Sequence, residues 1–195
     1  MGSLSMASAK SSFDNSQLFS RLSKNIEGDV LFDAFNRGRY STDASIYQID
    51  PVGVGLPKTE QDLVSAVEIS VEAGVPILAR GGGTSQCGQT VNEAVVIDCY
   101  RHLNKILDFN VEQKTIKVQP GLVLDHLNTF LKPHGLFFPV DISTASRATI
   151  GGMTSNNSCG ARSIHYGIMV DNVLSLIHIS EPTRLLSMSY AVFCL

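Results

Sequence analysis

The chain has 195 residues, of which 44% are apolar and 17% are charged, and its formal net charge is -3. This length suffices for one domain of ordinary size or two small lobes. The charge balance does not favour nucleic acid as a partner. No apolar run reaches the roughly 18 residues that a membrane-spanning helix needs. These features predict a globular protein without a transmembrane segment.

Residues 1–24 predict a leader followed by a short helix. The first dozen residues are rich in serine and lack an apolar stretch, so we expect disorder rather than a secretory signal. From residue 14, leucines recur at helical spacing, and Asp14 or Asn15 can cap the helix.

The four cysteines indicate a reducing environment. Cys87, Cys99, Cys159 and Cys194 form no C-x-x-C pair and have no zinc or iron–sulfur spacing. We therefore expect a cytoplasmic protein without a bound metal. Peripheral attachment to the inner face of a membrane is left open.

Residues 25–104 predict a small lobe with a parallel sheet. Residues 52–56 read as a buried strand, Thr59 caps a helix that ends at Gly74, and residues 76–79 form the next strand. A strand, a helix and a strand in this order make a parallel βαβ unit. A third strand is expected at residues 94–97.

Residues 105–176 predict a lobe with antiparallel strands. Residues 102–121 read as a hairpin, and residues 122–135 have the leucine spacing of a helix that ends at Gly135. We place the boundary between the lobes near residue 104. The predicted fold class is α+β.

The loop "ARGGGTSQCGQ" (residues 79–89) has the composition of an anion-binding loop. Amides of successive glycines can point into one concavity. Thr84 and Ser85 add hydroxyl donors, and Arg80 adds a positive charge at the rim. These groups suit a pyrophosphate.

A phosphate loop of the nucleotide phosphohydrolases is the main alternative. The pattern G-x-x-x-x-G-K-[ST] fits from Gly83 to Thr90, except that Gln89 replaces the lysine that contacts the phosphates. The next element reads as a strand, so no helix N-terminus faces the loop. Both features disfavour this class.

A second glycine-rich stretch covers residues 137–167. Structureless loops beyond about 12–15 residues are usually functional or disordered. Its many small polar residues argue against a core element. Two separated loops of this kind suggest one elongated ligand that is bound at several points.

The two glycine-rich segments carry a family resemblance. "ARGGGTSQCGQ" followed by "PVDISTASRATIGGMTSNNSCGARSIHYG" resembles the FAD-binding domain of the FAD-linked oxidases, which include vanillyl-alcohol oxidase, D-lactate dehydrogenase and the glycolate oxidase flavoprotein subunit. "GDVLFDAFNRGRYSTDASIYQIDPVGVGLPKT" is similar to the members that also carry an iron–sulfur domain, some of which oxidise D-2-hydroxyglutarate. The resemblance covers about residues 25–175 and implies a two-lobed FAD-binding domain.

The resemblance also implies which residues bind the cofactor. The residues expected to hold the pyrophosphate are Arg80, Gly81, Gly82, Gly83, Thr84, Ser85, Gly88 and Gln89. The residues expected to line the flavin or its ribityl chain are Pro139, Asp141 and Ser143. Those expected to pass along the cofactor are Thr149, Gly151, Gly152, Ser155 and Asn156, and those expected to close the far side are Ser158, Gly160, Tyr166 and Gly167.

The same resemblance implies how FAD is attached and which reaction it performs. Some relatives bind FAD covalently through a histidine in the glycine loop, and Thr84 occupies that place, so we expect non-covalent FAD. The implied reaction is hydride transfer from a D-2-hydroxy acid to the flavin, with D-lactate, glycolate or D-2-hydroxyglutarate as the type of substrate. The resemblance implies that the catalytic base lies outside this chain, and the electron acceptor is not assigned. A non-catalytic fragment that binds FAD weakly or not at all is the other alternative.

Residues 177–195 depart from the family pattern. The string "IHISEPTRLLSMSYAVFCL" resembles the translation of a sequencing-library adapter, and Pro182 and scattered serines break both helical and strand periods. We expect this tail to be non-native and to lie outside the fold, which would leave the antiparallel lobe incomplete.

Overall fold

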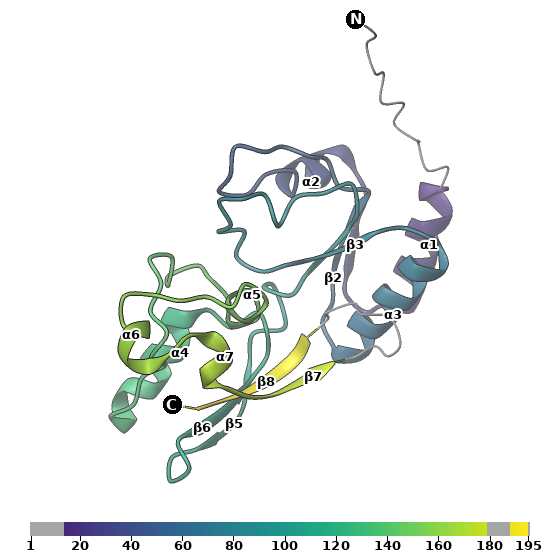
Figure 1. Ribbon diagram of the computed structural model, residues 1–195. Helices are drawn as coiled ribbons and strands as arrows, with labels where there is room; N and C mark the ends of the chain where they lie inside the picture. Colours follow the sequence, from purple (N-terminus) through teal and green to yellow (C-terminus); the bar gives the residue numbers. More distant parts are fainter. Residues whose placement is uncertain (1–13, 179–187, 195) are drawn as a thin grey trace, which may run out of the picture.

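The computed structural model describes residues 14–178 and 188–194, which form two four-stranded sheets (Figure 1). The strand order is β1-β2-β4-β3 in the first sheet and β5-β6-β8-β7 in the second. The first sheet is mostly parallel and the second is antiparallel, which confirms the predicted α+β fold class.

The first lobe contains the expected strand–helix–strand unit with one strand inserted. Its elements are α1 (Asn15–Asn25), β1 (Asp29–Leu31), α2 (Ala34–Arg39), β2 (Gly53–Leu56), α3 (Glu60–Glu72), β3 (Ile77–Arg80) and β4 (Val95–Asp98). β2 and β3 both pair in parallel with β4, which lies between them. β1 adds an antiparallel edge to β2. The sequence did not predict β1 and α2, because neither is long enough to establish a hydrophobic period.

The helix termini follow the predicted capping residues. The Asp14 carboxylate accepts hydrogen bonds from the amides of Ser16 (3.0 Å) and Gln17 (3.3 Å) at the start of α1. The Thr59 hydroxyl accepts from the amide of Asp62 (3.0 Å) at the start of α3. α1 packs beside α3 (Figure 1), and apolar side chains of both helices and of β4 form one core.

Asp62 connects α3 to the segment that precedes β1. Its side chain is buried, and its carboxylate accepts hydrogen bonds from the amides of Glu27 (2.9 Å), Gly28 (3.0 Å) and Lys58 (2.8 Å). Burial alone would raise the pKa of Asp62, but these donors outweigh it and hold the pKa below its usual value. The charged Asp62 carboxylate therefore holds the backbone before β1 and the backbone before α3 together.

The second lobe is built around a hairpin and a helix, as the sequence predicts. Its elements are β5 (Ile106–Asn110), β6 (Thr115–Val118), α4 (Leu124–Leu131), the 3-10 helix η1 (Lys132–His134), α5 (Ile150–Ser155), α6 (Ser163–Tyr166), α7 (Met169–Asn172), β7 (Val173–His178) and β8 (Met188–Cys194). β5 and β6 are antiparallel, and α4 buries its three leucines. The expected lobe boundary near residue 104 falls between β4 and β5.

The second glycine-rich stretch contributes to the core, contrary to our expectation. Ile150 and Met153 of α5 are 1% and 2% exposed and pack with Phe138 and Val140. A Cβ atom at Gly151 would lie only 2.6 Å from the Cβ of Pro120. The small residues thus permit close backbone packing, while the larger apolar residues between them fill the core.

The C-terminal segment also differs from the expectation. β8 lies between β6 and β7 and pairs with both in antiparallel orientation. Its residues include Tyr190, Val192 and Phe193, which are of types that favour strands, whereas Pro182 lies outside the described residues. The second sheet therefore has four strands, and the expectation of a tail outside the fold is not met for Met188–Cys194. The non-native origin of residues 177–195 stays a prediction.

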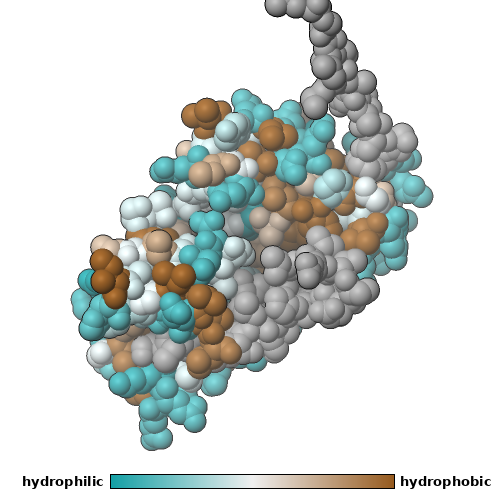
Figure 2. Space-filling model, viewed as in Figure 1, coloured by the Kyte–Doolittle hydropathy of each residue, from teal (hydrophilic) through white to brown (hydrophobic). Residues whose placement is uncertain are grey.

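Apolar side chains gather on the surface of the second lobe. Brown patches lie over the region of α6 and α7 (Figure 2), where Ile164, Val170 and Leu174 are 99%, 63% and 58% exposed. Exposed apolar patches often mark contacts with another polypeptide. Within residues 14–178 and 188–194, no helix has both the length and the apolar character needed to cross a bilayer.

Replacing Asp62 with alanine should destabilise the protein by about 2–4 kcal/mol, because three backbone donors lose a charged acceptor. Urea unfolding at pH 7 measures this change, and the exposed Glu68 of α3 provides the control Glu68→Ala. Since the folded pKa of Asp62 is lowered, its contribution is present above about pH 3.9 and is lost as the pH falls through the folded pKa. Equal stabilities of Asp62→Ala and Glu68→Ala would contradict this role.

Candidate functional site

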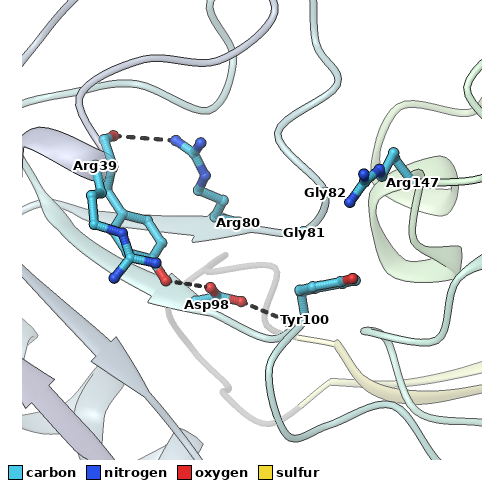
Figure 3. Close-up of a pocket in the computed structure, with 8 residues that line it drawn as sticks. Arg39, Arg80, Gly81, Gly82, Asp98, Tyr100 and Arg147 are labelled. Atoms are coloured by element: carbon cyan, nitrogen blue, oxygen red, sulfur yellow. Dashed lines mark hydrogen bonds between the residues drawn. The ribbon is translucent and has the colours of Figure 1, made fainter. Parts of the chain in front are cut away.

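A cavity of about 210 Å³ lies where the two lobes meet (Figure 3). Its lining residues are Arg39, Tyr40, Arg80, Gly81, Gly82, Asp98, Tyr100 and Arg147. Most of them lie at or just after the carboxyl ends of the parallel strands β3 and β4, where open α/β sheets usually bind ligands. Arg147 is the only one that comes from the second lobe, so the cavity depends on the contact between the lobes.

The segment after α2 holds the glycine loop from one side. The Arg80 guanidinium donates hydrogen bonds to the carbonyls of Tyr40 (3.2 Å), Thr42 (2.7 Å) and Thr90 (3.1 Å). The amide of Ala44 donates to the Gly83 carbonyl (3.1 Å). These bonds fix the path of the loop between β3 and β4 before any ligand binds.

The Arg80 side chain lines the cavity and also holds the loop in its path. Its guanidinium is occupied by three backbone carbonyls and does not stand free at the rim. Burial lowers the pKa of Arg80, and the negative charge of Asp98 opposes this effect. The Arg80 side chain thus holds the loop, and the contact of Arg80 with the cofactor stays a prediction.

The second lobe contacts the loop from the other side. A Cβ atom at Gly82 would overlap the carbonyl oxygen of Arg147 and lie 3.0 Å from the carbonyl carbon. A Cβ atom at Gly81 would overlap the Thr149 hydroxyl. The Gln89 side-chain amide donates to the Asn156 side chain (3.1 Å). The structure thus brings the first glycine loop together with residues 147–156 of the second one.

The glycine loop presents a row of free hydrogen-bond donors. Within the described part of the chain, no acceptor takes the backbone N–H groups of residues 81–86. Gly83 has φ +64°, which favours glycine. Ser85 is partly used inside the loop, because its hydroxyl donates to the Gln89 side chain and accepts from the amide of Cys87 (3.2 Å). Consecutive free amides of this kind suit an anion with several oxygens.

The floor of the cavity is a fixed polar network. Asp98, only 6% exposed, accepts hydrogen bonds from the Tyr40 hydroxyl (2.6 Å) and the Tyr100 amide (2.7 Å). Burial and the neighbouring Asp98 raise the pKa of Tyr40 well above its usual value, so this phenol stays a donor. Figure 3 shows Asp98 and Tyr100 facing the glycine residues across the cavity.

The other predicted site residues divide into two groups. The first group lies on or next to α5 and consists of Thr149, Gly151, Gly152, Ser155 and Asn156. Of these, Thr149 and Asn156 contact the glycine loop. A second group, around α6 and the segment before α5, contains Pro139, Asp141, Ser143, Ser158, Gly160, Tyr166 and Gly167. Asp141 accepts from the amide of Arg162 (2.9 Å) and lines a separate cavity of about 370 Å³ beside α4. The cofactor contacts of both groups stay predictions.

Sequence reasoning missed most of the cavity floor and both of its exposed arginines. The missed residues are Arg39, Tyr40, Asp98, Tyr100 and Arg147. Asp98 carried a usable signal, since it ends a buried strand next to the glycine loop. Arg39 and Arg147 carried none, because only the packing of distant segments brings them to the cavity.

No group of His, Cys, Asp or Glu side chains among residues 14–178 and 188–194 could hold a metal ion. The donors that the structure does bring together are amides, hydroxyls and guanidinium groups. An α/β lobe and an antiparallel lobe that meet at such a cavity define a domain for a phosphate-bearing cofactor.

Comparison with protein families identifies that cofactor. The family model for the FAD binding domain matches residues 51–183, and the chain belongs to this family. FAD is therefore the cofactor of the domain, and the free amides of residues 81–86 fit its diphosphate.

Individual proteins are similar over most of the chain. D-2-hydroxyglutarate dehydrogenase from Haemophilus influenzae is 39% identical over 156 residues, which cover 78% of this chain and 15% of that protein. The glycolate oxidase subunit GlcD from Bacillus subtilis is 37% identical over 155 residues, with coverages of 77% and 33%. The chain thus spans only a small part of the length of these relatives.

Solved structures share the fold. An alkyldihydroxyacetonephosphate synthase aligns with a TM-score of 0.78 at 19% identity, covering 91% of this chain and 40% of that one. At this level of identity, the likeness shows the two-lobed fold alone.

Replacing Gly82 with valine should abolish FAD retention. The reason is not the backbone conformation, because positive φ occurs at the neighbouring Gly83 and not at Gly82. The reason is steric, because the valine side chain would overlap the Arg147 carbonyl and push the loop and its free amides out of place.

The affinity for FAD should fall at least about ten-fold, as measured by flavin fluorescence titration. Gly38→Val is the matched control, since a Cβ atom at Gly38 meets nothing within 4 Å. Stoichiometric FAD in purified Gly82→Val would show that the loop assignment is wrong.

Proposed function

We propose that this chain is the FAD-binding part of a flavin-dependent dehydrogenase or oxidase that acts on a D-2-hydroxy acid. The observation that carries the proposal is the row of free amides at residues 81–86, held against the second lobe at Gly82. This arrangement offers a preformed site for the diphosphate of FAD, which the family membership independently requires.

The residues of this chain serve to bind and orient. The amides of residues 81–86 and the Thr84 hydroxyl would hold the diphosphate. Arg80 and Asp43 keep the loop in place through hydrogen bonds with Thr42 and Thr90. When bound, FAD supplies the acceptor for the hydride of the substrate. The glycine loop supplies no acid or base for the reaction, so its part is to position the cofactor.

The substrate class rests on the relatives. D-2-hydroxyglutarate dehydrogenases, a glycolate oxidase subunit and a D-lactate dehydrogenase are among the similar proteins. Since the chain spans 15% of the first of these, we assign the substrate-binding residues and the catalytic base to sequence beyond this domain. The cytoplasmic location expected from the cysteines stays a prediction.

The proposal is tested by the visible spectrum of the protein and its change with substrate. The purified chain mixed with FAD and passed through a desalting column should keep flavin absorption near one FAD per chain. In a full-length protein that contains this domain, anaerobic addition of D-lactate, glycolate or D-2-hydroxyglutarate should bleach that absorption, and the L-enantiomers of the chiral acids should not. Loss of all flavin on the column, or bleaching by none of these acids, would contradict the proposal.

FAD should be held without a covalent bond, because Thr84 cannot form the linkage that a histidine forms at this place. Acid precipitation of the flavin-loaded protein should release the flavin into the supernatant, where its fluorescence is measured. Flavin fluorescence that stays with the denatured polypeptide in a gel would refute this prediction.

A further inference from the structure

Arg147 contacts the glycine loop with its backbone and lines the cavity with its side chain. Its backbone is fixed, because its amide donates to the Thr144 carbonyl (2.9 Å) and its own carbonyl abuts Gly82. Its side chain lines the inter-lobe cavity and extends toward Gly82 (Figure 3). Among the described residues, the Arg147 guanidinium has no hydrogen-bond, ion-pair or ring partner.

The negative charge of a bound diphosphate requires a positively charged group that is free to bind it. The Arg80 guanidinium keeps its charge, but its donors are taken by three neutral carbonyls, and the loop amides carry no net charge. Asp98 adds a negative charge to the floor. A diphosphate brings further negative charge, and a cation without competing partners binds it through short, charge-assisted hydrogen bonds.

Arg39 is less suited to this task. It lies at the opposite end of the cavity in Figure 3, and its side chain donates to the Asn36 side chain (3.2 Å). Arg147, by contrast, projects from the residue whose carbonyl contacts the glycine loop itself.

We propose that Arg147 is the countercharge of the FAD diphosphate. The diphosphate then receives neutral amides from the first lobe and a guanidinium from the second, so that it links the two lobes. This inference rests on the proposed function and assigns a binding residue from the second lobe to the same site.

Substitution of Arg147 should affect binding and leave folding intact, because its side chain is exposed and contacts no described partner. Arg147→Met keeps the length and removes the charge, and Arg147→Lys keeps the charge and removes the fork of donors. Arg101→Met is the matched control, since Arg101 is also exposed but does not line the cavity.

The test is titration of the chain with FAD, riboflavin, ADP and adenosine. Arg147→Met should weaken FAD and ADP about ten-fold or more, with riboflavin and adenosine unchanged, because only the first two carry the diphosphate. Arg147→Lys should recover part of the loss. Added salt should weaken FAD binding less in Arg147→Met than in the wild type. Thermal unfolding without ligand should be the same in all variants.

The outcomes separate the two proposals. Wild-type protein that binds neither FAD nor ADP would overturn the proposed function, and the role of Arg147 with it. Wild-type protein that binds FAD while Arg147→Met binds it equally well would overturn the role of Arg147 alone. An equal loss in Arg101→Met would show a general charge effect and would also overturn it.

Discussion

The contact between Gly82 and the carbonyl of Arg147 is the constraint on which the site depends. The two lobes have separate sheets and separate cores. The glycine loop is one place where they come so close that a Cβ atom has no room, and Gly121 against the Cys99 carbonyl is another. Because the loop follows β3 and Arg147 precedes α5, this contact aligns the strand ends of one lobe with a helix of the other. The cavity exists because the two backbones meet there.

Bonds on the far side of the loop make it rigid before FAD binds. Arg80 uses its guanidinium to join Tyr40, Thr42 and Thr90, and Asp43 accepts from the Thr90 hydroxyl (2.9 Å). A loop already held in this way loses little conformational entropy on binding, which favours affinity. The Arg80 side chain thus binds backbone carbonyls of the protein itself. The cofactor would be bound by the loop amides and by charged side chains from other segments.

Local signals explain what the sequence could predict. α3 was predictable because Thr59 and Gly74 mark its ends, and the β5–β6 hairpin because its apolar residues alternate. β1 and α2 are too short for a period, and the pairing of β8 with β6 and β7 depends on long-range contacts. In the site, the glycine loop is predictable from its composition, whereas Arg39 and Arg147 reach the cavity only through tertiary packing. Composition also misled, since the small residues around Gly151 mark close packing in a core.

The central claim is that the amides of residues 81–86 bind the FAD diphosphate between the lobes. Hydrogen exchange of these amides, followed by mass spectrometry or NMR with and without FAD, tests it most directly. The account predicts fast exchange in the free protein and strong protection with FAD, but not with riboflavin, which lacks the diphosphate. Exchange at residues 81–86 that stays fast in protein saturated with FAD would contradict the claim.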